Sequence, residues 1–444
     1  MLSNSVARKL SRLAGEMYRL IAIGVVIQLF TIVSPAQSTF GEFVGTVRDP
    51  SQALIAGCTV TVKNLGTSAT RTAITDSTGS YTVVNLEPGD YEITMEAAGF
   101  QRLTRRNVQL LSRQTVRVDG AMTLSSQAQT VEVAVQAEAP INTEVSNIAE
   151  TKLGRELIDL PIALGSRAQG STSAFSTLTT QPGVEIDNNG NISIAGSNLD
   201  MLSMSIDGIS TMSPRNSAPI AELFPSFDGI AEIRVSEINN TAEFGGISDV
   251  TTISKGGTNQ YHGAIFENHQ NSAFAARNTF SSTVPKLIMN DFGASFGGPI
   301  SIPKLYSGKD RTFFFMDYEG LRLPRQSVLV ESVPSVPLRN GDLSAYATQI
   351  KAADGTPFPG NQIPVPRINS VSAGVLKYLF PLPNAGAPNA ISNNFVQNFG
   401  VPIVSNQGDM RLDQNISSKQ AAFARFTYKR HADSAYRATP APPL

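Results

Sequence analysis

Short runs in which apolar and polar residues alternate fill the sequence between residues 40 and 125. Runs such as "CTVTVKN" and "YEITME" place every second side chain on one face, as in a β-strand with one buried and one solvated face. Turn-forming residues separate these runs at 49–50, 64–66, 76–79 and 88–90. Regular short strands with such turns predict an antiparallel β-sandwich over residues 40–125.

A weaker alternation begins at residue 256. Its segments, "NQYHGAIFENHQ", "NDFGASFGGPI" and "TFFFMDYEGLR", are followed near the end by a hairpin pattern from "DMRLDQNIS" to "AAFARFTYKR". Segments of about ten residues with a period of two are typical of an outer-membrane β-barrel. A stretch at 324–405, rich in Pro, Asn and Gly, interrupts them, and we expect it to form a long extracellular loop.

The N-terminus has the pattern of a secretory signal peptide. A basic stretch precedes an apolar run at residues 20–33, and the small residues Ser34 and Ala36 follow it. This pattern predicts a signal peptide over residues 1–36, cut after Ala36. The apolar run is short for a transmembrane helix, so we expect this exported chain to enter a membrane only through strands.

The composition excludes several classes of function. The net charge is −1 and no long basic tract occurs, so nucleic acid is not expected as a partner. Cys58 is the only cysteine, and we expect it to be a small buried side chain. The three histidines lack metal-ligand spacing. The acidic pair Asp317 and Glu319 has no base or metal beside it on its strand. We therefore expect no enzyme, no metal and no cofactor.

The order of strands and turns in the first segment resembles the carboxypeptidase regulatory-like domain, close to the collagen-adhesin B-type fold. Gly79 and Gly89 supply turn geometry, while Tyr81, Tyr91 and Phe100 are expected to point into one small core. The resemblance implies a stalk or binding domain without catalytic groups. The residues that carry it are Gly45, Asp49, Asp76, Gly79, Tyr81, Leu86, Pro88, Gly89, Tyr91, Ala98, Gly99 and Phe100.

The segment at 144–255 resembles the plug domain of TonB-dependent receptors. It begins with the helix-like "RELIDLPIA" and continues through a Pro-Gly-Val, an isoleucine-rich strand ending in Gly, and an Ile-Asp-Gly turn. Two departures, Ala195 where many such receptors carry Arg and Phe244 where Tyr is commoner, leave the ligand open. The plug motif implied by the resemblance comprises Gly196, Asp207, Gly208, Phe244 and Gly245, with further matches at Val184, Ile206, Ile230, Ile233, Val235 and Lys255.

A linker at 126–143 contains a short alternating strand. A free extended segment of this kind can add to the sheet edge of a partner. The strand resembles the TonB box, which engages the energy-coupling protein TonB, but it also fits a plain linker strand. The candidate box residues are Thr130, Val131, Glu132, Val133, Ala134 and Val135.

The third segment, 256–444, resembles the Oar-like branch of TonB-dependent receptors through "HGAIFE", "FGGPI" and "DRTFFFMDYEGLR". The expected fold is therefore mainly β: a small antiparallel sandwich, an α+β plug, and the first strands of a transmembrane barrel. A plugged transporter barrel has about 22 strands. Only 189 residues follow residue 255, so we expect an incomplete barrel, the N-terminal part of a receptor that does not transport alone.

Within that barrel, the strand at 312–322 is expected to have two unlike faces. Phe314, Met316 and Tyr318 share one face, which we expect to meet lipid, with Tyr318 in the aromatic girdle. The other face, with Phe313, Phe315 and Asp317, is expected to turn from apolar to acidic where it leaves the plug for water.

The resemblance implies a TonB-dependent outer-membrane receptor or transporter. Its extracellular loops and plug apex would capture a small ligand, and a pull by TonB on the box would remodel the plug. Its surroundings would be outer-membrane lipid. Saccharides, peptides and chelated metals fit the loops alike, and the oligomeric state is open. The alternatives are a secreted or surface β-sandwich protein that binds carbohydrate or peptide, and a non-functional remnant.

Overall fold

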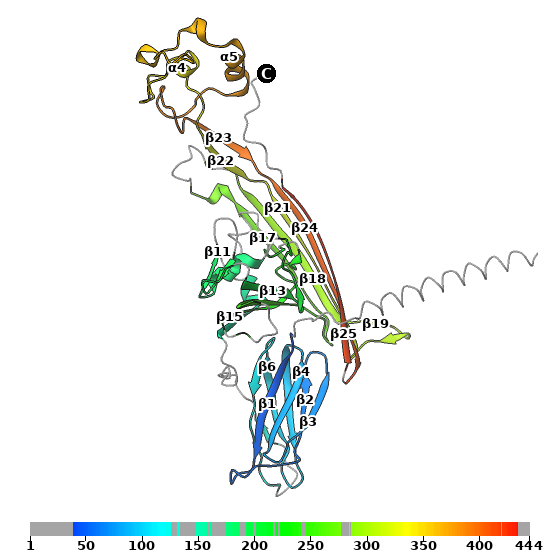
Figure 1. Ribbon diagram of the computed structural model, residues 1–444. Helices are drawn as coiled ribbons and strands as arrows, with labels where there is room; N and C mark the ends of the chain where they lie inside the picture. Colours follow the sequence, from blue (N-terminus) through cyan, green and yellow to red (C-terminus); the bar gives the residue numbers. More distant parts are fainter. Residues whose placement is uncertain are drawn as a thin grey trace, which may run out of the picture.

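The computed structural model describes residues 39–125, 131–133, 148–158, 160, 174–186, 192–198, 201–215, 218–220, 223–238, 240, 246–276, 284, 286–418 and 420–433. The predicted signal peptide at 1–36 lies outside these residues, as do Thr130, Ala134, Val135, Phe244 and Gly245. The described elements form a β-sandwich, a middle domain above it, and a long curved sheet that passes beside the middle domain (Figure 1).

The sandwich consists of two sheets that enclose an apolar core. In one sheet β1 (Gly41–Arg48) pairs antiparallel with β4 (Ser80–Leu86) and parallel with both β7 (Thr115–Arg117) and β8 (Gly120–Ala121). The other sheet has the order β3 (Thr70–Ile74), β2 (Thr59–Asn64), β5 (Gly89–Glu96), β6 (Leu103–Leu110) and β9 (Val131–Val133). The largest core side chains with almost no exposed surface are Phe43, Ile93, Met95, Leu110 and Met122.

The turns and aromatic residues of the sandwich behave as their sequence predicts. The Asp76 carboxylate accepts hydrogen bonds from the amides of Thr78 at 2.7 Å and Ser80 at 3.0 Å, which fixes the turn before β4. Tyr81 and Tyr91 are buried, and each hydroxyl donates to a backbone carbonyl at 2.6 Å. Burial raises the pKa of both phenols. Cys58 is buried in the same core, as predicted.

The middle domain is built on a five-stranded sheet. Its order is β10 (Ile148–Leu153), β15 (Ile230–Ile238), β16 (Ser248–Ser254), β13 (Leu202–Ile206) and β14 (Ile209–Ser210), with β13 and β16 parallel. A hairpin of β11 (Val184–Ile186) and β12 (Ile192–Ile194), α2 (Gly154–Ile158) and the 3₁₀ helix η1 (Ala174–Thr180) contribute to the apolar core on one face. Alternation along β15 places Ile233 and Val235 in that core and sends Glu232 and Arg234 to the other face.

The long sheet has five antiparallel strands. They are β17 (His262–Asn271), β18 (Ile288–Pro299), β21 (Thr312–Leu323), β24 (Ile403–Ser417) and β25 (Gln420–Asp433), in that order. A hairpin of β19 (Ser301–Ile302) and β20 (Tyr306–Ser307) joins β18 to β21, and the 3₁₀ helix η4 (Ser272–Phe274) follows β17. Within the described residues the sheet is open, with β17 and β25 as its edges.

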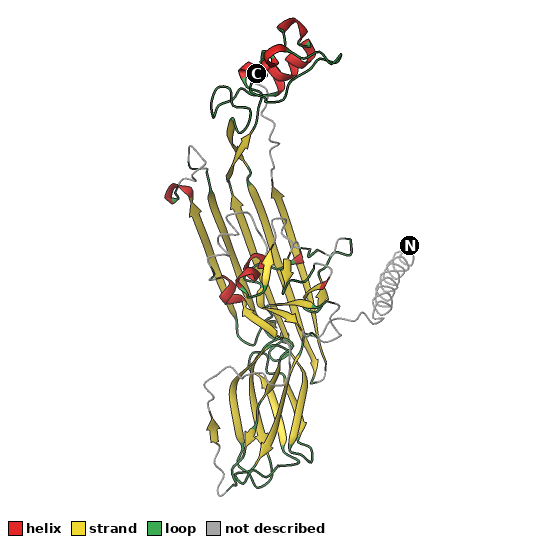
Figure 2. Cartoon of the chain, turned by 60° about the vertical axis from the view of Figure 1, so that its left-hand side comes forward, coloured by secondary structure: helices red, strands yellow, loops and turns green. Residues whose placement is uncertain are grey.

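The stretch at 324–405 carries structure of its own at the end of the long sheet that lies away from the sandwich (Figure 2). β22 (Gln326–Glu331) and β23 (Phe395–Gly400) pair as an antiparallel ladder and lead into a small cap. The cap contains α4 (Val336–Arg339), α5 (Ser370–Leu379) and the 3₁₀ turns η5 (Pro359–Asn361) and η6 (Val365–Arg367). Among the described helices, none combines the length and apolar character needed to cross a membrane.

The two faces of β21 differ as predicted in one respect and not in another. Phe313 and Phe315 are buried on one face, whereas Met316 is 44% exposed on the other. The prediction that Asp317 reaches water is wrong, because the middle domain covers it. Asp317 is buried, and a Cβ built on Gly229 of the middle domain would lie 2.6 Å from its Oδ2.

Candidate functional site

A row of polar side chains on the long sheet meets the middle domain. These residues, called the polar row, alternate along β21, β24 and β25 on the face opposite Met316. Half of them are buried and the rest are half-buried, so the interface between the two bodies is polar rather than apolar. The polar row consists of Asp317, Glu319, Gln407, Asp409, Arg411, Asp413, Arg425 and Thr427.

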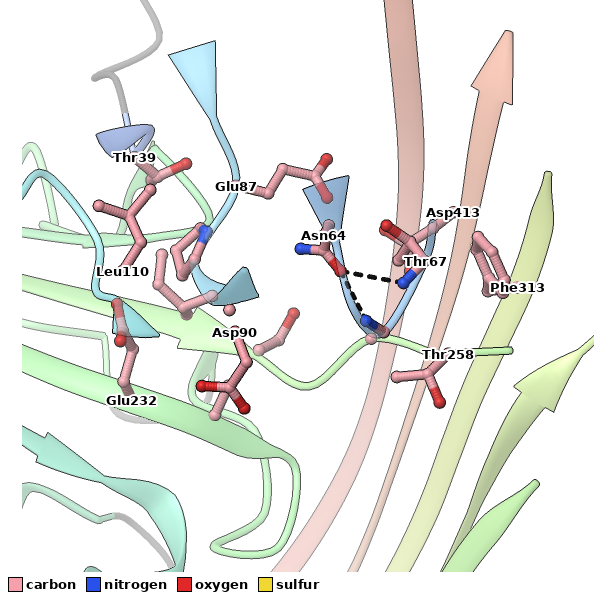
Figure 3. A pocket seen from close by; sticks show the side chains of 18 of the residues that line it. Thr39, Asn64, Thr67, Glu87, Asp90, Leu110, Glu232, Thr258, Phe313 and Asp413 are labelled. Carbon is pink, nitrogen blue, oxygen red and sulfur yellow. Dashed lines mark hydrogen bonds between the residues drawn. The ribbon is translucent and has the colours of Figure 1, made fainter. Parts of the chain in front are cut away.

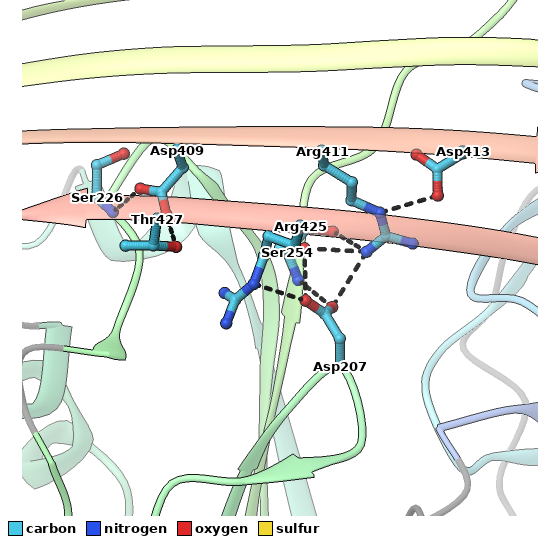
Figure 4. Close-up of polar contacts among 8 residues, drawn as sticks. All are labelled: Asp207, Ser226, Ser254, Asp409, Arg411, Asp413, Arg425 and Thr427. Atoms are coloured by element: carbon cyan, nitrogen blue, oxygen red, sulfur yellow. Dashed lines mark hydrogen bonds and ion pairs between the residues drawn. The ribbon is translucent and has the colours of Figure 1, made fainter. Parts of the chain in front are cut away.

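Asp207 of the middle domain is the centre of this interface (Figure 4). It sits in the tight turn between β13 and β14, with φ of +50° at Asp207 and +82° at Gly208, as a type I′ hairpin requires. Its carboxylate accepts hydrogen bonds from Ser254 N at 2.9 Å and Ser254 Oγ at 2.8 Å. Arg411 Nη1 lies 3.1 Å from Oδ1 and Arg425 Nε 3.5 Å from Oδ2. Two strands of the long sheet thus hold one turn of the middle domain by charge.

A second set of contacts holds the loop before β15. Asp409 accepts hydrogen bonds from Ser226 N at 3.1 Å and from Thr427 Oγ1 at 2.5 Å. Gln407 Nε2 donates to the carbonyl of Phe224 at 2.8 Å, and Phe227 N donates to Glu319 Oε2 at 3.3 Å. The long sheet therefore contacts backbone groups of this loop. These contacts fix the position of the loop without requiring particular side chains in it.

Two carboxyl groups also face each other in this interface. Asp317 and Asp409 are direct partners across the β21–β24 ladder, and both are buried. Like charges directly opposite each other destabilise a sheet. Buried charged groups that are only partly compensated contribute little net stability, because water solvates the same groups when the surfaces separate. These charged contacts therefore require a defined orientation of the middle domain and add little net stability to it.

A cavity of about 540 Å³ lies where the sandwich, the middle domain and the long sheet meet (Figure 3). Asn64 and Glu87 of the sandwich line it together with Asp207, Arg411 and Asp413. Asn64 Oδ1 accepts hydrogen bonds from Gly66 N and Thr67 N, both at 2.9 Å, which shapes the loop at its edge. Burial raises the pKa of the Glu87 carboxyl. Within the described residues, no group of three or more His, Cys, Asp or Glu side chains could hold a metal ion.

The structure places some of the predicted site residues together and separates others. Asp207 and Gly208 lie at the interface just described, while Gly196 forms a turn after β12 with φ of +72°, where an added Cβ would have no atom within 4 Å. Residues 131–133 of the candidate TonB box form β9, which pairs in parallel with β6 of the sandwich. Phe244, Gly245, Thr130, Ala134 and Val135 are outside the described residues.

Sequence reasoning missed the partners of Asp207 and the whole polar row on β24 and β25. The signal that could have found them is the alternation in "DMRLDQ", which puts Asp409, Arg411 and Asp413 on one face of a strand. Charged side chains repeated on one face of a barrel strand face away from lipid. Asp409, Arg411 and Asp413 therefore require contact either with water or with polar groups of another part of the protein.

Known protein families match the N-terminal and the C-terminal parts of this chain. Residues 253–444 match the outer membrane beta barrel domain, and residues 42–123 match the carboxypeptidase regulatory-like domain. The TonB-dependent transporter Oar of Myxococcus xanthus is 26% identical over 332 residues, which cover 70% of this chain and 29% of Oar. The chain thus spans less than a third of the length of that relative.

Solved structures give only a distant likeness. Catechol 1,2-dioxygenase of Acinetobacter radioresistens is 13% identical with a TM-score of 0.18, covering 22% of this chain and 56% of that one. Hydroxyquinol 1,2-dioxygenase of Pseudomonas putida DLL-E4 is 7% identical with a TM-score of 0.17, covering 21% and 58%. Scores this low support no conclusion about the present chain.

Proposed function

We propose that this homologue of the TonB-dependent transporter Oar acts in an outer-membrane receptor that admits a ligand by moving its middle domain. The observation that carries the proposal is the charged contact of Asp207 with Arg411 and Arg425. It fixes the middle domain against the long sheet through groups that water can also satisfy. In this proposal the middle domain is the plug, and the motif Gly196, Asp207, Gly208, Phe244 and Gly245 belongs to it.

The outward face of the long sheet supports a position in the outer membrane. Met410, Phe426 and Tyr428 are exposed there, on strands whose opposite face carries Asp409, Arg411, Arg425 and Thr427. An apolar outward face with a polar inner face is the pattern of strands in a bacterial outer-membrane barrel. Export by the signal peptide at 1–36 belongs to the same proposal.

The proposed transport step begins at the candidate TonB box. TonB would bind the candidate box at 130–135 by strand addition and pull it. The load would reach the middle domain at β10, an edge strand that pairs only with β15 among the described strands. Peeling an edge strand disturbs one ladder at a time, so the middle domain would loosen before the apolar core separates. The ligand class, whether saccharide, peptide or chelated metal, stays open.

Membrane fractionation of the full chain tests the proposed location. Phe426 is 67% exposed on the outward face of β25, and His431 lies on the opposite face of the same strand. An arginine on a lipid face costs about 2–4 kcal/mol near the membrane centre. We expect the wild-type chain and His431→Arg in the outer-membrane fraction, with heat-modifiable migration, and Phe426→Arg depleted from it. A wild-type chain in the soluble periplasmic fraction would instead favour the secreted β-sandwich alternative.

Binding to purified TonB tests the candidate box. Val133→Pro removes a backbone donor from the segment, whereas Val133→Ile keeps both the donor and the β-propensity. We expect Val133→Pro to lose binding and Val133→Ile to keep it. Equal binding by both variants would identify the segment as a plain linker.

A further inference from the structure

The sandwich contacts the middle domain through the turn between β6 and β7. Ser112 has no exposed surface, and both its backbone amide and its backbone carbonyl make hydrogen bonds to the middle domain. Ser112 N donates to Glu232 Oε1 at 2.6 Å, and Arg234 Nη1 donates to the Ser112 carbonyl at 3.2 Å. Two side chains of β15 therefore form hydrogen bonds with the backbone of one residue of the sandwich.

The next residue, Arg113, adds an ion pair to the same contact. Its guanidinium pairs with Asp249 and donates to Thr251 Oγ1 at 3.1 Å. The Arg113 side chain is 10% exposed and that of Asp249 is fully buried. Ser203 Oγ and Thr251 Oγ1 each donate to Asp249 at 2.6 Å, so the acceptor is held in place. The backbone of Arg113 is left-handed, with φ of +57°, which a side chain other than glycine rarely adopts without support.

The surface under this turn is the polar face of the middle-domain sheet. Ser205, Ser236 and Arg234 lie on it and are buried. Four buried polar atoms at this contact, one of the sandwich and three of the sheet, have no hydrogen-bond partner among the described residues: Ser112 Oγ, Ser205 Oγ, Ser236 Oγ and Arg234 Nε. Buried polar groups without partners oppose burial, and water would satisfy them if the surfaces separated. This interface is thus specific in geometry but weak in net stability.

The sandwich, in contrast, is complete without its neighbour. Its apolar core cluster is formed by residues between Phe43 and Met122 and includes none from the middle domain. A body with its own closed core can separate from a polar interface and stay folded. A second polar contact, from Asn259 N to the Gly66 carbonyl at 2.8 Å, joins the sandwich to the start of the long sheet and is equally replaceable by water.

We propose that the Ser112–Arg113 turn is a latch by which the sandwich docks reversibly on the polar face of the middle-domain sheet. When the latch opens, the sandwich swings away as a folded body, and the face with Glu232, Arg234 and Asp249 becomes accessible to solvent. The inference goes beyond the proposed function. Docking of the sandwich on the middle domain does not depend on ligand transport, so it can be measured in a chain that does not transport.

Distance measurement between spin labels on the full chain in detergent micelles tests the latch. The labels are placed on exposed positions, Thr82→Cys in the sandwich and Ser307→Cys in the β19–β20 hairpin, while buried Cys58 stays unlabelled. Double electron–electron resonance should give one narrow distance for the docked wild type. Arg113→Glu places a like charge beside Asp249, and we expect the ratio of narrow to broad distances to fall at least tenfold.

Two further variants separate the latch from general effects of charge. Arg102→Glu makes the same charge change at an exposed ion pair with Glu96 inside the sandwich, and it should leave the narrow distance intact. Arg113→Lys keeps the charge but not the forked donor, so it should give an intermediate ratio. Thiol labelling of Cys58 in Arg113→Glu without label sites should stay as slow as in wild type.

Two results would overturn the inference. An unchanged distance distribution in Arg113→Glu would show that the latch does not hold the sandwich. Fast labelling of Cys58 in step with the broad distances would show that the sandwich unfolds rather than detaches.

Discussion

The interior of the sandwich and the interface between the middle domain and the long sheet are both buried, but side chains of opposite character fill them. Phe43, Ile93 and Met95 pack inside the sandwich, whereas Asp207 and Arg411 meet at the interface. Apolar burial is stabilising in proportion to the area removed from water and needs no particular partner. Charged contacts demand geometry and contribute less, since water competes for the same groups. The apolar core therefore accounts for the stability of the sandwich, whereas the charged contacts fix how the middle domain sits against the long sheet.

Removal of a core side chain from the sandwich should give the largest effect. The Phe43 ring has no exposed surface and lies edge-on to Tyr91, with centroids 5.4 Å apart. Phe43→Ala should lower the free energy of unfolding of the sandwich by about 3–5 kcal/mol, because it leaves a cavity. The rate of Cys58 labelling in denaturant measures this loss. Phe40→Ala, at a residue 44% exposed, should change it little; equal effects of the two variants would contradict an apolar core as the source of stability.

Removal of one charge from the interface should have a smaller, local effect. Asp207→Asn keeps the left-handed turn, which asparagine tolerates, but loses the ion pairs with Arg411 and Arg425. A hydrogen bond to a charged group contributes about 1.5–3 kcal/mol. We expect faster hydrogen exchange at the amides of Ser226 and Phe227, which the long sheet holds, with the sandwich unchanged.

The control for Asp207→Asn lies on the same arginine. Asp413 pairs with Arg411 within β24, with Arg411 Nε and Asp413 Oδ1 2.9 Å apart. Asp413→Asn removes an equal charge from the long sheet itself. If Asp413→Asn accelerated hydrogen exchange at Ser226 as much as Asp207→Asn does, the faster exchange would result from a changed position of Arg411. It would not then report on the contact between the middle domain and the long sheet.

The latch should respond to pH through Glu232. Burial raises the pKa of this carboxyl above its ordinary value, and hydrogen bonding to Ser112 opposes the shift. The docked state therefore binds the proton more tightly than a state in which Glu232 meets water. Its contribution to docking is fully present below the ordinary pKa and is lost as pH rises through the raised pKa.

The groups around Glu232 set the control for that pH dependence. Arg234, whose pKa burial lowers to about 10, stays cationic near neutral pH, and the ion pair of Arg113 with Asp249 completes the cluster. Glu232→Gln keeps an acceptor for Ser112 N and removes the titration. We expect the docked fraction of the wild type to fall as the pH rises above the ordinary glutamate pKa of about 4, and that of Glu232→Gln to stay flat. The same slope in both chains would assign the effect to another group.

Features set by neighbours in the sequence could be predicted. The alternation in the sandwich, the turn at Asp76 and the Asp207-Gly208 turn all form as expected. The faces of β21 also follow from alternation alone. The mainly β fold with an outer-membrane barrel domain is confirmed, and so is the resemblance to a TonB-dependent transporter with a carboxypeptidase regulatory-like domain. Each of these depends on spacing within one segment.

Contacts between distant segments could not be predicted. Arg411 lies 204 positions from Asp207, and Arg113 lies 136 positions from Asp249. Alternation tells which side chains share a face but not what covers that face. The same gap made the prediction for Asp317 wrong, because an acidic residue on an inner face was assigned to water although a loop of the middle domain packs on it. A charged side chain on the inner face of a barrel strand therefore indicates polar surroundings. These can be water or a polar surface of another domain.

The smallest effect should come from an ion pair that is neither buried nor at an interface. Arg102 pairs with Glu96 on the sandwich surface, where their side chains are 59% and 45% exposed. An exposed pair of this kind contributes about 0.2–1 kcal/mol and is screened by salt. Arg102→Ala should therefore shift the free energy of unfolding, followed by Cys58 labelling, by less than about 1 kcal/mol at low salt. The shift should shrink further at high salt. A loss as large as that of Asp207→Asn would mean that burial is not what distinguishes the charged interface from the surface.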